Sequence, residues 1–218
     1  MKKINYLNKI DYWTAENTFY LKGTPYRMSK FIAHYEIFKK IKDLKGDVVE
    51  CGVFRGASFS RFLSFNKIFS KNKYFYGLDA FGSFPKNKNK KDDINFAKKH
   101  DQKVGYGIDV KNLNYLLKKN NYKNFKLIKG DVIETVENLI KKKIKISLLH
   151  LDLDVYTATK FCLEKLFPLV VKKGIILIDD YSHIINTTLA VNEFLKKHKK
   201  LKIDKLDFPC RPRYIIKK

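Results

Sequence analysis

The sequence contains little cysteine, and its cysteines lack the spacing of a zinc site. Its 218 residues include only Cys51, Cys162 and Cys210, which are far apart and odd in number. No CxxC pair or cysteine–histidine cluster accompanies them, which argues against zinc ligation. This cysteine usage predicts a reducing compartment.

Long hydrophobic runs are also missing. No stretch approaches the roughly 20 apolar residues that span a bilayer, and the first residues, MKKINYLNKIDYW, lack the apolar run of a signal peptide. We therefore expect a soluble, cytoplasmic protein without a membrane span. Hydrophobic residues still make up 44% of the chain and aromatic residues 14%, which excludes a wholly disordered chain. At roughly 100–200 residues per domain, the length predicts one domain with a small appendage.

Acidic residues and arginine are scarce as well. There are 22 Asp and Glu against 46 Lys and Arg, a net charge of +24, and such a charge favours an anionic partner. However, 41 of the cations are lysines and only five are arginines, the residue that best recognises phosphates and bases. Two interpretations therefore stay open: a solvated basic surface, or a preference for an anionic substrate or partner.

Strand-like and helix-like segments alternate along the chain. Apolar spacing predicts a helix over 28–44, a second over about 56–70, and others over 132–142, 157–171 and 187–199. Short apolar runs predict strands at 47–52, 74–78, 125–129, 144–151 and 174–178. These runs are rich in Val, Ile and Leu, as expected for parallel strands covered by helices on both faces. Two further runs within 201–217 predict an antiparallel edge, which gives an α/β fold with a mostly parallel seven-stranded sheet.

Two segments lie outside this rhythm. Residues 1–45 are predicted to be an N-terminal helical segment or lid, placed before a domain that spans 46–218. Within that domain, residues 86–124 are rich in Lys and Asn and contain few apolar residues before Leu113. Such an insertion is typical of a lid or mobile loop, but a lysine-rich excursion without a role fits it equally well.

Three successive strand ends carry residues suited to a nucleotide-type cofactor. The first strand leads into a turn with Gly52 and Gly56, where the backbone can approach a ligand closely and the next helix offers free N–H groups. Asp79 after the second strand could accept hydrogen bonds from ribose, and Asp131 after the third could read an adenine edge. Each feature alone has a structural alternative: a plain strand–helix turn, a surface acid or a helix N-cap. Together they have the layout of methyltransferases that use S-adenosylmethionine on a Rossmann-like sheet. The candidate cofactor-binding residues are Glu50, Gly52, Val53, Phe54, Gly56, Ser58, Asp79, Ala80, Gly130, Asp131 and Val132.

Four carboxylates follow the next two strands. Asp152 and Asp154 end the fourth predicted strand, and Asp179 and Asp180 end the fifth. Neighbouring acids repel one another unless a cation or proton offsets their charge, and oxygen ligands with open water positions suit Mg²⁺, Mn²⁺ or Ca²⁺. The alternative is a set of strand-end caps paired with surface lysines.

A catalytic role follows from this predicted metal site. The cation would lower the pKa of an acceptor hydroxyl, and whichever of Asp152 and Asp154 does not bind the metal would remove its proton. His150 is a candidate second base or a core histidine, and the spacing of these residues does not decide between the two.

These motifs resemble one known family. The segments VECGVFRGAS, YGLDAFGSFP, LLHLDLDVYTATK and GIILIDDY are similar to those of the macrocin O-methyltransferases over residues 28–195. The resemblance implies a class I methyltransferase fold, S-adenosylmethionine contacts at Glu50, Gly52, Asp79 and Asp131, magnesium held by the aspartates and an Asp as base. It also implies an acceptor that is a sugar or a sugar-bearing small molecule of a glycan or natural-product pathway.

Two other functions compete with this one. The high positive charge favours a nucleic-acid methyltransferase on the same fold, although an NPPY-type motif is absent and arginines are few. A basic, non-catalytic adaptor would keep the fold and leave the aspartates without a role. We expect a small-molecule acceptor rather than a nucleic acid, and a homo-oligomer stays open.

Overall fold

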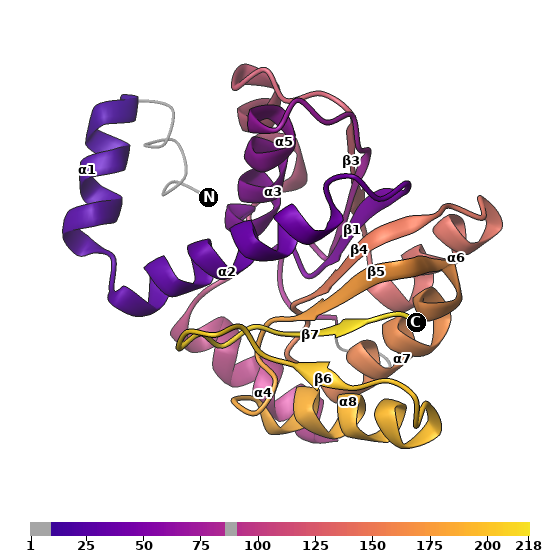
Figure 1. Ribbon diagram of the computed structural model, residues 1–218. Helices are drawn as coiled ribbons and strands as arrows, with labels where there is room; N and C mark the ends of the chain where they lie inside the picture. Colours follow the sequence, from indigo (N-terminus) through magenta and orange to yellow (C-terminus); the bar gives the residue numbers. More distant parts are fainter. Residues whose placement is uncertain (1–9, 86–90) are drawn as a thin grey trace.

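A seven-stranded sheet forms the centre of the protein in a computed structural model that describes residues 10–85 and 91–218 (Figure 1). The strand order is β3-β2-β1-β4-β5-β7-β6. Strands β1 to β5 pair in parallel, and β7 runs antiparallel to both β5 and β6. This confirms the predicted parallel sheet with an antiparallel edge. The bounds are β1 Asp47–Cys51, β2 Phe75–Asp79, β3 Phe125–Lys129, β4 Ile146–Leu151, β5 Val170–Ile178, β6 Ile203–Asp204 and β7 Arg213–Ile216.

Helices cover both faces of the sheet, as Figure 1 shows. Side chains alternate along a strand, so Leu148 of β4 joins the core cluster on one face and Leu149 joins the cluster on the other. The first cluster contains residues of α2 (Pro25–Ile41), α3 (Ala57–Ile68) and α5 (Val110–Lys119). The second contains residues of α6 (Val132–Lys141), α7 (Tyr156–Leu166) and α8 (Ile185–Lys197).

The helix predicted over 157–171 is shorter than expected. Helix α7 ends at Leu166, a 3-10 turn spans Phe167–Leu169, and β5 begins at Val170. Pro168 accounts for the difference, because a proline has no N–H to continue a helix.

The segment 86–124 holds more structure than the sequence predicted. It contains α4 (Lys91–Lys103) and α5, while residues 86–90 lie outside the described residues. Asp109 caps α5 by accepting hydrogen bonds from the Lys111 and Asn112 amides, and Leu113 and Leu117 of α5 are buried in the core. These two leucines, one turn apart, dock the short helix α5 on the core. A lid role for this segment stays a prediction.

The N-terminal segment contains two helices. Helix α1 (Tyr12–Lys22) begins after Asp11, which caps it, and none of its residues is buried; Figure 1 shows it away from the sheet. The predicted helix 28–44 is α2, which starts earlier because Pro25 suits a first helical turn. Residues 1–9 lie outside the described residues, and a lid role for 1–45 stays a prediction. Within the described ranges, no helix is long and apolar enough to cross a membrane.

Candidate active site

Gly52 brings the ends of β1 and β4 together. Its φ is +91°, and a Cβ at this position would lie 1.8 Å from the Asp152 carbonyl oxygen. The Asp152 amide donates to the Cys51 carbonyl at 2.9 Å, which fixes this close approach. Only glycine fits here, so the predicted glycine turn places the β4 carboxylates beside the β1 turn.

A cavity of about 300 Å³ opens at the carboxyl ends of the strands. Its volume lies at the lower end of the range of small-molecule sites. Asp152 and Asp154 line the same cavity. The candidate cofactor residues that line it are Gly52, Phe54, Asp79, Ala80, Gly130, Asp131 and Val132.

Both acids predicted to bind the nucleotide accept hydrogen bonds from backbone amides of the protein. One Asp79 oxygen accepts from the Val53 and Phe54 amides, each at 2.8 Å, and so braces the glycine turn. Asp131 accepts from the Ile133 amide at 2.9 Å and is the N-cap of α6. The other Asp79 oxygen accepts from the Phe81 amide at 2.5 Å. An ionised carboxylate has about four acceptor positions, so these contacts leave one position on Asp79 and more on Asp131.

Four other predicted cofactor residues do not line the cavity: Glu50, Val53, Gly56 and Ser58. Glu50 is fully buried, accepts from the Ser58 hydroxyl at 2.6 Å and lies 3.3 Å from His150 Nδ1. Val53 is a core residue, and Gly56 starts α3 with a φ of +84°. These residues shape the turn, and direct contact with a cofactor stays a prediction for them.

Three of the four predicted metal ligands converge. Carboxylate oxygens of Asp152, Asp179 and Asp180 lie within 4.8 Å of one another. Asp154 is not in this group, because β4 ends at Leu151 and Asp154 has a φ of +62°, so strand alternation does not extend to it. Its side chain lines the cavity instead.

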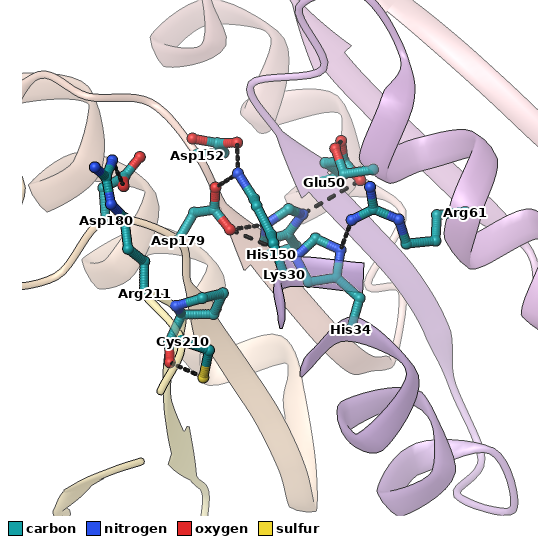
Figure 2. A network of polar contacts seen from close by, with 12 residues as sticks. Lys30, His34, Glu50, Arg61, His150, Asp152, Asp179, Asp180, Cys210 and Arg211 are labelled. Carbon is teal, nitrogen blue, oxygen red and sulfur yellow. Dashed lines mark hydrogen bonds and ion pairs between the residues drawn. The ribbon is translucent and has the colours of Figure 1, made fainter. Parts of the chain in front are cut away.

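Two cations from outside the motifs contact these acids (Figure 2). Lys30 of α2 forms an ion pair with Asp179, and its ammonium lies 3.7 Å from Asp152. Arg211 lies 3.3 Å from Asp180. Both cations are distant in sequence from the acidic motifs, so the spacing within those motifs does not indicate them. Their charge partly neutralises the acidic group.

A buried row of polar side chains leads from the acids into the core. Arg61 donates to His34 Nδ1 at 3.0 Å, and His34 Nε2 lies 3.4 Å from Asp179. His150 lies between Asp179, at 3.6 Å, and Glu50. Burial lowers the pKa of His34 to about 3. Burial also acts to lower the pKa of His150, but the Glu50 and Asp179 carboxylates outweigh it and raise that pKa to about 10. His150 is therefore the charged histidine of the pair.

The carboxylates differ in their affinity for protons. Burial and the Asp179 charge raise the pKa of Asp152, and burial with the Asp180 and Asp179 charges raises the pKa of Asp154 to about 7. Burial acts to raise the pKa of Asp179 too, but contacts with His150 and His34 and the Lys30 charge hold it well below its usual range. Asp179 is therefore a fixed anion, while Asp154 can exchange a proton near neutral pH.

Asp93 of α4 is a positioning residue that the sequence analysis missed. It is fully buried and accepts hydrogen bonds from the Tyr156 amide at 2.7 Å and the Thr157 amide at 2.9 Å. It also accepts from Asn186 Nδ2 at 3.1 Å. Asp93 thereby ties α4 to the start of α7, directly after Asp154. Only its acidity within a lysine-rich stretch could have indicated it.

Comparisons with solved structures show the fold that this chain shares with other proteins. The O-methyltransferase NovP superposes with a TM-score of 0.72 at 20% identity, covering 84% of this chain and 78% of its own. CalS11, a calicheamicin methyltransferase, gives 0.75 at 20% identity, covering 99% and 90%. An rRNA methylase from Streptococcus thermophilus gives 0.51 at 15% identity, covering 85% and 92%. At these identities the likeness concerns the fold, which is that of the Rossmann-like class I methyltransferases.

The family follows from the sequence itself. The profile of the macrocin-O-methyltransferase (TylF) family matches residues 24–210. The chain therefore belongs to this family of S-adenosylmethionine-dependent O-methyltransferases, which confirms the resemblance inferred from the motifs. No curated protein sequence is similar enough to match it.

Proposed function

We propose that this protein transfers a methyl group from S-adenosylmethionine to a hydroxyl of a sugar or sugar-bearing small molecule, with help from a divalent cation. The observation that carries the proposal is the position of Asp152, which lines the cavity and also belongs to the group of three converging carboxylates. Family membership supports the reaction. CalS11, described as a TDP-rhamnose 3'-O-methyltransferase, supports a sugar as the acceptor class.

The cavity residues would bind the methyl donor. Asp79 and Asp131 line it; Asp79 keeps one acceptor position for a ribose hydroxyl, and Asp131 keeps positions for the adenine amino group. Gly52 has no side chain to block the backbone from the ligand. The donor supplies a methyl group on a positively charged sulfur, and the nearby carboxylates favour that charge.

The three converging carboxylates fit a magnesium-type ion. Asp152, Asp179 and Asp180 offer only oxygen ligands, and two of them remain partly exposed, which leaves room for water or acceptor oxygens. Lys30 already contributes a positive charge to this group, so an entering ion must share the carboxylates with it or displace it. A bound divalent cation would supply Lewis acidity to an acceptor hydroxyl.

We assign Asp154 as the base. It lines the cavity, lies outside the converging carboxylates, and has a pKa raised to about 7. The Asp180 and Asp179 charges contribute to this raised pKa, so a cation bound to them would lower it. The assignment therefore rests on the position of Asp154 at the cavity. Lys30 does not compete for this role, because the Asp152 and Asp179 charges outweigh its burial and raise its pKa, which keeps it protonated.

Thermal unfolding with two ligands tests the proposal. S-adenosylhomocysteine and Mg²⁺ should each raise the melting temperature, and a ligand at about 100 times its Kd adds roughly 2.7 kcal/mol of stability. Transfer of a labelled methyl group to a sugar acceptor should be lost in Asp154→Asn with binding of S-adenosylhomocysteine retained. Absence of any shift with S-adenosylhomocysteine contradicts the proposal.

Two of the five arginines, Arg55 and Arg61, give no support to a nucleic-acid substrate. Arg55 is hydrogen-bonded to the Val104 and Tyr106 carbonyls, and Arg61 is partly buried against His34. These arginines support the fold instead of forming a row on the surface. If the protein binds RNA weakly and with a steep salt dependence, we attribute that binding to the charge of the surface lysines and not to a specific RNA substrate.

A further inference from the structure

A second cavity lies beside the acidic group. It is an open groove with a volume of about 910 Å³, bounded by the start of α2, His183 and the segment 205–213. Its lining includes Tyr26, Lys205, Phe208 and Arg211. Arg211 also contacts Asp180, as Figure 2 shows, so this residue of the groove adjoins the acidic group.

Arginine is concentrated at this groove. The chain has 41 lysines and five arginines, and two of the five, Arg211 and Arg213, line the groove. Arg213 donates to the carbonyls of Cys210, Arg211 and Pro212 and so holds the loop in shape. Arg211 is thereby presented from a braced turn.

The Arg211 side chain is poised to bind an anion. Its guanidinium lies 4.5 Å from the centre of the Tyr26 ring, and only Nη1 contacts Asp180, at 3.3 Å. The side chain is 41% exposed. A guanidinium carries five N–H donors, so most of them face no acceptor within the described residues. A stacked guanidinium with free donors is suited to bidentate recognition of a phosphate.

The other residues that line the groove are also mainly basic or aromatic. Lys205 is exposed and has no ion-pair partner among the described residues. Asp207 is the acid in the lining, against Lys205, Arg211 and Arg213. Tyr26 and Phe208 add aromatic surface. A positively charged groove with aromatic walls favours a phosphate ester that carries an organic group over a neutral sugar.

We propose that this groove binds the phosphate of the acceptor, so that the substrate is a sugar phosphate or sugar diphosphate and not a neutral glycoside. The inference rests on the proposed function, because it places the reacting hydroxyl at the carboxylates and the phosphate at Arg211. Asp180 contacts Arg211 and belongs to the acidic group, so the two subsites adjoin each other.

Calorimetric titrations of the full chain with S-adenosylhomocysteine bound test the proposal. The probes are glucose 1-phosphate, UDP-glucose and methyl glucoside, at about 0.15 M salt, where distant surface lysines are largely screened. We expect both phosphate esters to bind at least about tenfold more tightly than the neutral glucoside. Tighter binding of UDP-glucose than of glucose 1-phosphate would indicate that the aromatic side chains of the groove contact the nucleoside. Equal binding would indicate that the groove recognises only the phosphate.

Two variants and a matched control locate the binding. Arg211→Gln should weaken binding of the phosphate esters about tenfold or more, and Lys205→Gln should weaken it about threefold. Lys202→Gln removes an exposed lysine outside the groove and should change nothing. Lys205→Gln keeps the test valid if Arg211→Gln fails to fold.

The outcomes separate this inference from the proposed function. If the native chain does not bind S-adenosylhomocysteine, the proposed function is contradicted. Normal S-adenosylhomocysteine binding overturns the groove proposal alone in three cases: if methyl glucoside binds as well as the phosphates, if both groove variants match the control, or if the phosphates displace S-adenosylhomocysteine.

Discussion

Replacement of Lys30 by methionine should destabilise the protein by removing the cation paired with Asp179. The Lys30 side chain is 13% exposed and that of Asp179 is 1% exposed, so the pair is largely shielded from water. Loss of one partner from such a pair typically costs 3–5 kcal/mol. We expect about 3 kcal/mol, the lower end, because His34 and His150 remain in contact with Asp179. For a domain of this size, that loss lowers the melting temperature by roughly 6–12 °C.

Thermal unfolding with and without Mn²⁺ measures this effect. A divalent cation should restore much of the lost stability to Lys30→Met, since it can neutralise the same carboxylates. Lys40→Met is the matched control, because Lys40 lies on the same helix, is exposed and has no acidic partner among the described residues. Equal melting temperatures for the two variants would refute the reasoning about Lys30. A loss in Lys30→Met that Mn²⁺ does not reverse would refute the idea that lysine and metal serve the same group.

Three further outcomes follow from the site. Asp93→Asn should cost about 1–3 kcal/mol in urea unfolding, because it weakens the hydrogen bonds to the Tyr156 and Thr157 amides; an unchanged midpoint would contradict its role. The stability that His150 contributes is complete below its ordinary pKa of 6.5 and should be lost as pH rises through about 10, since folding raises its pKa; a His150→Asn variant with the same alkaline profile as the native chain argues against this. Gly52→Ala should abolish S-adenosylhomocysteine binding in calorimetry, because its Cβ would overlap the Asp152 carbonyl; native-like affinity would show that the turn tolerates a side chain.

Local patterns predicted the sheet and the strand-end residues well. Parallel strands place their carboxyl ends at one edge, so Gly52, Asp79 and Asp131 could be assigned to one cavity from their positions after three strands. The same reasoning placed Asp152 near Asp179, because β4 and β5 are neighbours. In both cases the parallel direction and the order of the strands in the sheet determine which residues meet.

Contacts between distant segments could not be predicted in this way. Lys30, Arg211 and Asp93 reach the site from α2, the C-terminal loop and α4, and no periodicity links them to the acidic motifs. Asp154 is predicted with Asp152 as part of one metal site, but β4 ends at Leu151 and Asp154 has a positive φ, and it lies outside the converging carboxylates. Side-chain pairing across the fold and local backbone conformation decided these positions.

Titration of Mn²⁺ into the protein with S-adenosylhomocysteine bound tests the central claim most directly. The native chain should show one binding site, which Asp179→Asn should lose and Asp43→Asn, a change at an exposed acid, should keep. Equal Mn²⁺ binding by the native chain and Asp179→Asn, or no binding by the native chain, would contradict the claim that Asp152, Asp179 and Asp180 form a cation site.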